Sequence, residues 1–187
     1  FDRVRLNLND NKPSATPTPD RLKAYRNGTT DHALEELYFQ FGRYLLISSS
    51  RPGQMPANLQ GIWQNNTSAP WHADFHNNVN IQMNYWRALT TNLAECAEPM
   101  ETFIRTLEKP GSRTAESYFG KGGWTASISA NPFGFTAPFA RVSMISNLGF
   151  ILGPWLATHM WEYFDFTRDY DFLRRSYHLI KGGADFA

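Results

Sequence analysis

The residues Asp31–Ile47, DHALEELYFQFGRYLLI, carry the clearest helical signal in the chain and set its expected fold class. Their apolar side chains recur at helical spacing and so line one side of a helix. These side chains are Leu34, Leu37, Tyr38, Phe41 and Leu45. Asp31 stands where its carboxylate can cap the first turn. We therefore predict an amphipathic helix here, with its apolar stripe packed into a core.

The rest of the chain alternates long loops with further helices. Loops are expected where Ser, Pro and Gly are frequent, because these residues favour turns over helix interiors. Helices are expected where apolar residues return at helical spacing. Within the first of these helical stretches, Pro99 marks either a break or the first turn of a new helix. We expect loops over 48–70 and 120–150, and helices over 81–107, 149–166 and 169–187.

Helices joined by long loops, with almost no alternation of apolar and polar residues, predict an all-α toroid whose loops build one face. The exception is Phe1–Leu8, where apolar and polar residues do alternate, so this segment is either a strand or an extended arm. Residues 1–30 contain three prolines among Ser, Thr, Asn and Asp, which is typical of a linker. We expect an extended or helical linker over 1–30 and one helical domain over 31–187.

The composition argues against several classes of function. The formal net charge is +1 and no basic run occurs, so neither nucleic acid nor an anionic membrane is favoured as a partner. Apolar stretches are too short and too interrupted for a membrane span. The single cysteine, Cys96, excludes an internal disulfide, and the five histidines lack paired ligand spacing. No metal or other cofactor is expected.

The two ends of the sequence suggest a piece of a longer protein. There is no initiator methionine, and the last residues, Leu179–Ala187, still have a helical pattern. We take the chain to be an internal fragment. The lack of a signal peptide therefore says nothing about its destination.

Aromatic residues make up 15% of the chain and include six tryptophans. Sugar rings present flat C–H faces that stack on aromatic rings, so this surplus suits a site for glycans. The alternative is that these side chains fill the core. The densest mixture of polar and aromatic residues is WHADFHNNVNIQMNYW, residues 71–86.

Asparagines are unusually frequent in this run, although they disfavour helix interiors. If residues 76–80 are extended, His76, Asn78 and Asn80 point to one side and can hold sugar hydroxyls or a water molecule. The alternative is a helix N-terminus with local asparagine caps and turns. The aromatic residues that flank His76, Asn78 and Asn80 favour the sugar site, and they are Trp63, Trp71, Phe75 and Trp86.

Several separated phrases of the sequence together resemble glycoside hydrolase family 95. They are YFQFGRYLLISSSRPG at 38–53, PANLQGIW at 56–63, HNNVNIQMNYW at 76–86 and TNLAEC at 91–96. The resemblance implies a protein with an N-terminal β-sandwich, a helical linker, an (α/α)6 barrel and a C-terminal β-domain. On this basis residues 1–30 are the linker that follows the sandwich, and 31–187 are the first part of the barrel.

The resemblance also implies an activity, which is hydrolysis of terminal α-L-fucosyl linkages with inversion. In this family asparagine amides hold the attacking water, and a distant aspartate polarises an amide so that it acts as base. The water-holding amides fall on Asn78 and Asn80, the catalytic candidates. The candidates for substrate binding are His76, Trp63 and Trp71.

The general-acid glutamate and the polarising aspartate have no matching motif in the chain. By the resemblance both lie beyond Ala187, so we expect this chain alone to be inactive. The implied partner is a fucosylated oligosaccharide or polysaccharide. The implied location is extracellular or periplasmic.

Two departures from the family pattern leave alternatives open. Ala130 stands before Asn131-Pro132-Phe133-Gly134, where the family often has an acidic residue, and residues 141–146 lack the tryptophan that often follows. A missing carboxylate and a missing ring would change substrate contacts. The alternatives are an α-L-galactosidase of the same family or a relative that binds glycans without cleaving them.

Overall fold

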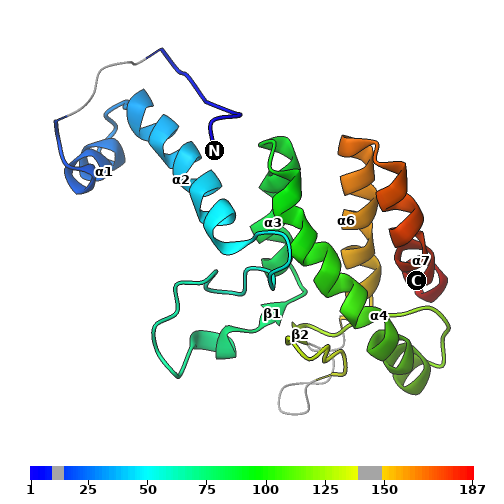
Figure 1. Ribbon diagram of the computed structural model, residues 1–187. Helices are drawn as coiled ribbons and strands as arrows, with labels where there is room; N and C mark the ends of the chain where they lie inside the picture. Colours follow the sequence, from blue (N-terminus) through cyan, green and yellow to red (C-terminus); the bar gives the residue numbers. More distant parts are fainter. Residues whose placement is uncertain (10–14, 139–148) are drawn as a thin grey trace.

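The computed structural model describes residues 1–9, 15–138 and 149–187, which are mostly helical (Figure 1). Its helices are α1 (Thr18–Arg26), α2 (His32–Ser49), α3 (Asn80–Thr90), α4 (Glu98–Phe119), α6 (Leu152–Thr167) and α7 (Tyr170–Phe186). Two short 3-10 helices, η1 (Pro70–Ala73) and η2 (Ala94–Ala97), and two short strands, β1 (Phe75–His76) and β2 (Ser129–Ala130), join them. The all-α class predicted from the sequence is confirmed.

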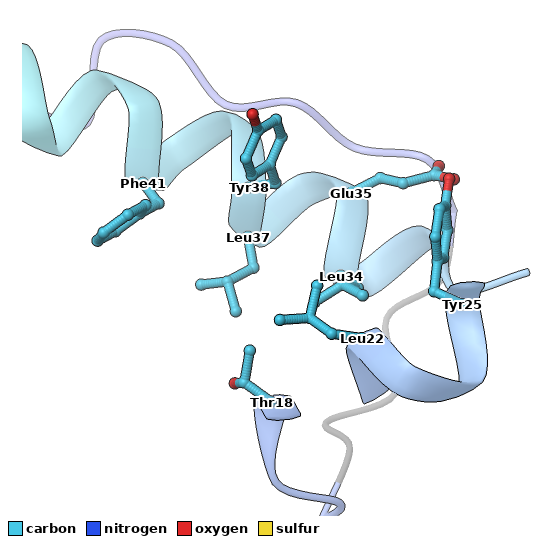
Figure 2. A pocket seen from close by; sticks show the side chains of 8 residues that line it. All are labelled: Thr18, Leu22, Tyr25, Leu34, Glu35, Leu37, Tyr38 and Phe41. Carbon is cyan, nitrogen blue, oxygen red and sulfur yellow. The ribbon is translucent and has the colours of Figure 1, made fainter. Parts of the chain in front are cut away.

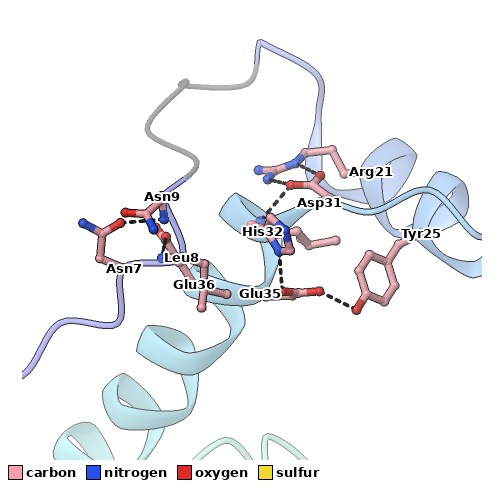
Figure 3. Close-up of polar contacts among 10 residues, drawn as sticks. Asn7, Leu8, Asn9, Arg21, Tyr25, Asp31, His32, Glu35 and Glu36 are labelled. Carbon is pink, nitrogen blue, oxygen red and sulfur yellow. Dashed lines mark hydrogen bonds and ion pairs between the residues drawn. The ribbon is translucent and has the colours of Figure 1, made fainter.

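The helix predicted from Asp31 is α2, which begins at His32 and has Asp31 as its N-cap. A side-chain oxygen of Asp31 accepts a hydrogen bond from the backbone N–H of Leu34 at 2.9 Å, which caps the first turn. Arg21 of α1 donates two hydrogen bonds to the same carboxylate, and these lower the pKa of Asp31 to about 2. Tyr25 also donates to Glu35 (Figure 3). Polar contacts therefore join α1 to the start of α2.

The apolar stripe of α2 does not pack into the core, and this part of the sequence prediction is wrong. Leu34 is buried, but Tyr38 is 78% exposed and Phe41 is 51% exposed. Among the described elements, α2 contacts mainly α1 and α3, and the nine-residue α1 is too short to cover the stripe. A groove of about 720 Å³ remains between α1 and α2 (Figure 2). Its apolar lining comes from Leu22, Tyr25, Leu34, Leu37, Tyr38 and Phe41.

The N-terminal segment forms an arm, which was one of the two structures its sequence pattern allowed. The buried Arg43 of α2 donates hydrogen bonds from Nη1 to the carbonyls of Phe1 and Val4, at 2.7 and 2.9 Å. The side chain of Gln40 also donates to the Val4 carbonyl. The arm is therefore held along α2 by side chains and not by pairing with another strand.

The core lies among β1, α3, α4, α6 and α7. Pro99 stands in the first turn of α4, so it opens a new helix, the second of the two possibilities expected. The helices α6 and α7 form a hairpin (Figure 1). Asp169 caps α7 by accepting a hydrogen bond from the N–H of Phe172 at 2.8 Å. None of the helices in the described parts of the chain is both long and apolar enough to cross a membrane.

The long loop that follows α2 is anchored by α3. The Tyr85 hydroxyl lies 2.6 Å from the Ser50 hydroxyl and accepts a hydrogen bond from the N–H of Ala57. Burial raises the pKa of Tyr85 to about 12. Asn84 donates to the carbonyls of Ala57 and Asn58. This loop and both strands therefore gather at one end of the helices, the lower end in Figure 1.

Candidate functional site

The strand β1 lies within the polar run 71–86 and orients the side chains of Phe75 and His76. It pairs antiparallel with β2, with Phe75 opposite Ala130 and His76 opposite Ser129. Phe75 is buried and packs against Phe103, their ring centroids 4.6 Å apart. Because successive residues of a strand face opposite sides, Phe75 points into the core and His76 points away from it.

His76 is held by a carboxylate two residues earlier in the chain. Its Nδ1 lies 2.5 Å from Oδ1 of Asp74, and both side chains are 18% exposed. The backbone of Asp74 is extended, with φ −83° and ψ −172°. Residues two apart in an extended segment face the same side, which explains why Asp74 and His76 meet.

Beyond His76 the backbone differs from the extended segment predicted over 76–80. The strand ends at His76, a turn follows, and α3 begins at Asn80. Asn78 in the turn and Asn80 at the helix start are both exposed. The simple alternation of His76, Asn78 and Asn80 along a strand is therefore wrong, and the backbone matches the alternative of a helix N-terminus with asparagines in a turn.

Buried hydrogen bonds of Asn77 anchor the start of the turn. Its side-chain amide donates to the Ser127 carbonyl at 2.8 Å, and its backbone N–H donates to the Ile128 carbonyl at 2.7 Å. The buried side chain of Gln82 donates to the Asn77 carbonyl at 2.6 Å. Buried polar groups need such partners, so these contacts fix Asn77 at the point where the chain leaves β1 and enters the turn.

Backbone strain is concentrated on both sides of β1. Four of the seven non-glycine residues that have positive φ in the described parts of the chain are Trp71, His72, Ala73 and Val79. Val79 is β-branched, which makes its φ of 141° especially unfavourable. Each such residue costs on the order of 1–3 kcal/mol, and residues of this kind cluster at functional sites. The segment 71–80 is therefore the strongest candidate site in the structure.

An exposed tryptophan lies in the loop after α2, and another lies at the start of the segment 71–80. Trp63 is 48% exposed and Trp71 is 71% exposed. The N–H of Leu59 donates to the Asp74 carbonyl at 3.3 Å, and the side chain of Gln60 donates to the Pro70 carbonyl at 3.2 Å. These bonds tie the part of the loop that carries Trp63 to the part that leads into β1.

The position of the Trp63 ring depends on a glycine. A Cβ atom at Gly61 would lie 2.6 Å from a ring carbon of Trp63, and the φ of Gly61 is +66°. A side chain at Gly61 would therefore both strain the backbone and displace the ring. Trp63 is held over the backbone of Gly61 while its other parts stay exposed.

The whole chain, residues 1–187, matches the model of the family described as glycosyl hydrolase family 95 catalytic domain. The chain belongs to glycosyl hydrolase family 95. The resemblance inferred from the sequence is confirmed, and with it membership of a family of glycoside hydrolases.

Relatives of this family 95 chain include proteins named as fucosidases. It is 41% identical over 192 residues to "Alpha-L-fucosidase 2" of Arabidopsis thaliana, in a match that covers 100% of the chain and 22% of that protein. It is 38% identical over 190 residues to "Probable alpha-fucosidase A" of Aspergillus niger, covering 100% of the chain and 24% of that protein. The chain thus spans less than a quarter of the length of these two relatives.

The sequence prediction for this family 95 chain missed Asp74 as a partner of His76. The signal that could have revealed it is the spacing of two residues, had the extended segment predicted over 76–80 been started two residues earlier, at Asp74. The described residues contain no group of three or more His, Cys, Asp or Glu side chains that could hold a metal ion.

The two departures from the family pattern differ in what the structure says of them. Ala130 is buried opposite Phe75, and directly opposed residues of an antiparallel pair share a face. Ala130 therefore faces the core, on the side away from His76. The other departure, at 141–146, lies outside the described residues.

Proposed function

We propose that the full-length protein cleaves terminal α-L-fucosyl linkages of oligosaccharides or polysaccharides with inversion of configuration. The observation that carries the proposal is the strained segment 71–80, which holds a partly exposed imidazole and two exposed carboxamides in a chain of family 95. The relatives named as alpha-fucosidases support this choice of substrate.

In the proposed mechanism Asn78 and Asn80 hold the attacking water through their side-chain amides. Both residues are exposed, and neither side chain has a hydrogen bond to another described residue, so both amides are free to bind water. Inverting glycosidases place a general acid and a base about 6.5–9.5 Å apart on opposite sides of the scissile bond. An amide is a weak base and needs a polarising carboxylate. We place that carboxylate and the general acid in the part of the protein outside this chain.

In the same proposal three aromatic side chains bind the sugar. Trp63 and Trp71 offer exposed ring faces for the apolar face of a pyranose. His76 contacts a sugar hydroxyl. A site with a few oriented polar groups among aromatic rings is typical of small-ligand recognition.

We further propose that residues 31–187 are the first part of an (α/α)6 barrel and that residues 1–30 are the linker after a β-sandwich. The gathering of loops at one end of the helices supports a barrel whose loops form the site (Figure 1). We expect the enzyme outside the cell or in the periplasm, where fucosylated glycans are accessible.

The test is an assay of the full-length protein on fucosylated oligosaccharides, with the anomer of the released fucose followed by NMR. We expect β-L-fucose as the first product, because the linkage is α and the mechanism inverts. Asn78→Ala and Asn80→Ala should each lower kcat by about 100- to 10,000-fold. Asn27→Ala, an exposed asparagine at the end of α1, is the matched control and should keep activity. Absence of fucose release, or α-L-fucose as first product, would count against the proposal.

The alternatives are an α-L-galactosidase and a glycan-binding relative without turnover. The glycan-binding alternative was based on Ala130, where the family often has an acidic residue. Because Ala130 faces the core, this difference has less effect on substrate contacts. Faster cleavage of α-L-galactosides in the same assay would favour the first alternative. Glycan binding without cleavage would favour the second.

A further inference from the structure

The contact between Asp74 and His76 has a chemical consequence beyond the proposed function. A carboxylate only accepts hydrogen bonds, so the imidazole atom that faces it must carry the proton. With Nδ1 2.5 Å from Oδ1 of Asp74, the hydrogen lies on Nδ1. The neutral ring is then left with a bare lone pair on Nε2.

Backbone contacts hold both Asp74 and His76 in place. The Asp74 carbonyl accepts from the N–H of Leu59, and the Asp74 N–H donates to the Trp71 carbonyl at 3.4 Å. His76 is fixed by pairing with Ser129. The backbone therefore holds both partners, and the hydrogen bond between them sets the rotation of the ring.

The outer end of the ring is free to meet a ligand. Nε2 of His76 has no hydrogen bond to any residue within 1–9, 15–138 or 149–187, and the side chain is partly exposed. It lies on the side of β1 that faces away from the core. A group oriented in this way accepts a hydrogen bond from a hydroxyl.

We infer that Asp74 is a positioning residue of the sugar site, which holds His76 as the Nδ1–H tautomer so that Nε2 accepts a hydrogen bond from a sugar hydroxyl. This rests on the proposed function, because His76 is taken there to contact the sugar. Asp74 itself touches no substrate. Its effect passes entirely through the imidazole, as carboxylates do when they orient catalytic or metal-binding histidines.

The kinetic test uses the full-length protein with Asp74→Asn, which keeps the size of the side chain. The amide can donate to Nδ1 as well as accept from it, so the ring is no longer held in one tautomer. We expect kcat/KM for a fucoside to fall about 10- to 100-fold, mainly through KM. In a His76→Ala background the same change should have no further effect, because the residue through which Asp74 acts is gone. Equal losses in both backgrounds would overturn the inference.

A spectroscopic test does not depend on activity. Histidine labelled with ¹⁵N in the full-length protein, at a pH near 8 where an ordinary imidazole is neutral, should show the proton of His76 on Nδ1. In Asp74→Asn the proton should move toward Nε2, while Asp171→Asn, an exposed carboxylate on α7, should leave the His76 signals unchanged. A wild-type His76 with its proton on Nε2 would refute the inference.

The two tests separate failure of the inference from failure of the proposed function. If the wild-type protein releases no fucose but His76 has its proton on Nδ1, the proposed function fails and the orienting role of Asp74 stands. If fucose is released but Asp74→Asn has normal KM and an unchanged tautomer, the role of Asp74 fails and the function stands.

Discussion

His159 of α6 is a buried histidine that changes the stability of the fold with pH. It is 8% exposed, and its Nε2 is buried without a hydrogen-bond partner among the described residues. Burial lowers the pKa of His159 to about 4, well below its ordinary value. As pH falls from about 6.5 to 4, the unfolded chain therefore binds a proton that the folded chain does not. Stability falls over this range.

Lowering the pH from 7 to 5 should cost the folded chain about 2 kcal/mol through His159. His159→Gln should remove this part of the pH dependence of the unfolding midpoint. His178→Gln, at a half-exposed histidine on α7, is the control and should retain it. Burial raises the pKa of the neighbouring Glu162, which acts in the opposite direction, so the two variants must be compared at each pH. Equal pH dependence in wild type and His159→Gln would contradict the prediction.

At the scale of elements, the start of α6 packs directly on the loop that leads to β2. A Cβ atom at Gly153 would lie 2.5 Å from the Cα of Thr125 and 3.1 Å from the backbone nitrogen of Ala126. Only a residue without a side chain allows this approach. The packing of α6 on the loop therefore depends on Gly153.

We expect Gly153→Ala to destabilise the chain by about 1–3 kcal/mol, because the helix or the loop must move to make room. Gly42→Ala is the matched control, since Gly42 also lies inside a helix but has no atom within 4 Å of its Cβ position. This change should be neutral or stabilise by up to about 1 kcal/mol through helix propensity. Urea unfolding followed by helical circular dichroism measures both, and equal effects of the two changes would show that the close approach is unimportant.

At the scale of the whole molecule, the groove between α1 and α2 leaves the stripe of α2 exposed to solvent (Figure 2). A chain that spans less than a quarter of its relatives is expected to expose faces that a longer protein covers. We predict that the 187-residue chain binds an apolar dye such as ANS more strongly, per mole, than the full-length protein. Phe41→Ser should reduce this binding, whereas Ser112→Ala, at an exposed position on α4, should not.

The isolated chain is also expected to release no fucose, because its proposed mechanism requires two carboxylates from elsewhere in the protein. The same assay on the full-length protein is the positive control. Measurable turnover by the isolated chain would mean that a general acid lies within the 187 residues.

Much of the helical structure followed from residues that are close together in the sequence. Asp31 caps α2 and Pro99 opens α4, and each does so through groups within one turn of the helix. Helical periodicity and caps are local properties, so a sequence contains them whatever the distant packing. Family membership was likewise evident from short phrases in order.

Contacts between distant segments settled the rest. The stripe of α2 is exposed because few described elements pack on it, which periodicity does not reveal. The start of the turn after β1 is anchored by bonds from Asn77 to residues 127–128, some fifty positions away. The side of the sheet on which His76 lies is set by the pairing of β1 with β2, more than fifty positions away. Which groups face a site depends on which distant polar and apolar groups are buried together. Those groups become neighbours only in the folded chain, so local sequence patterns do not reveal them.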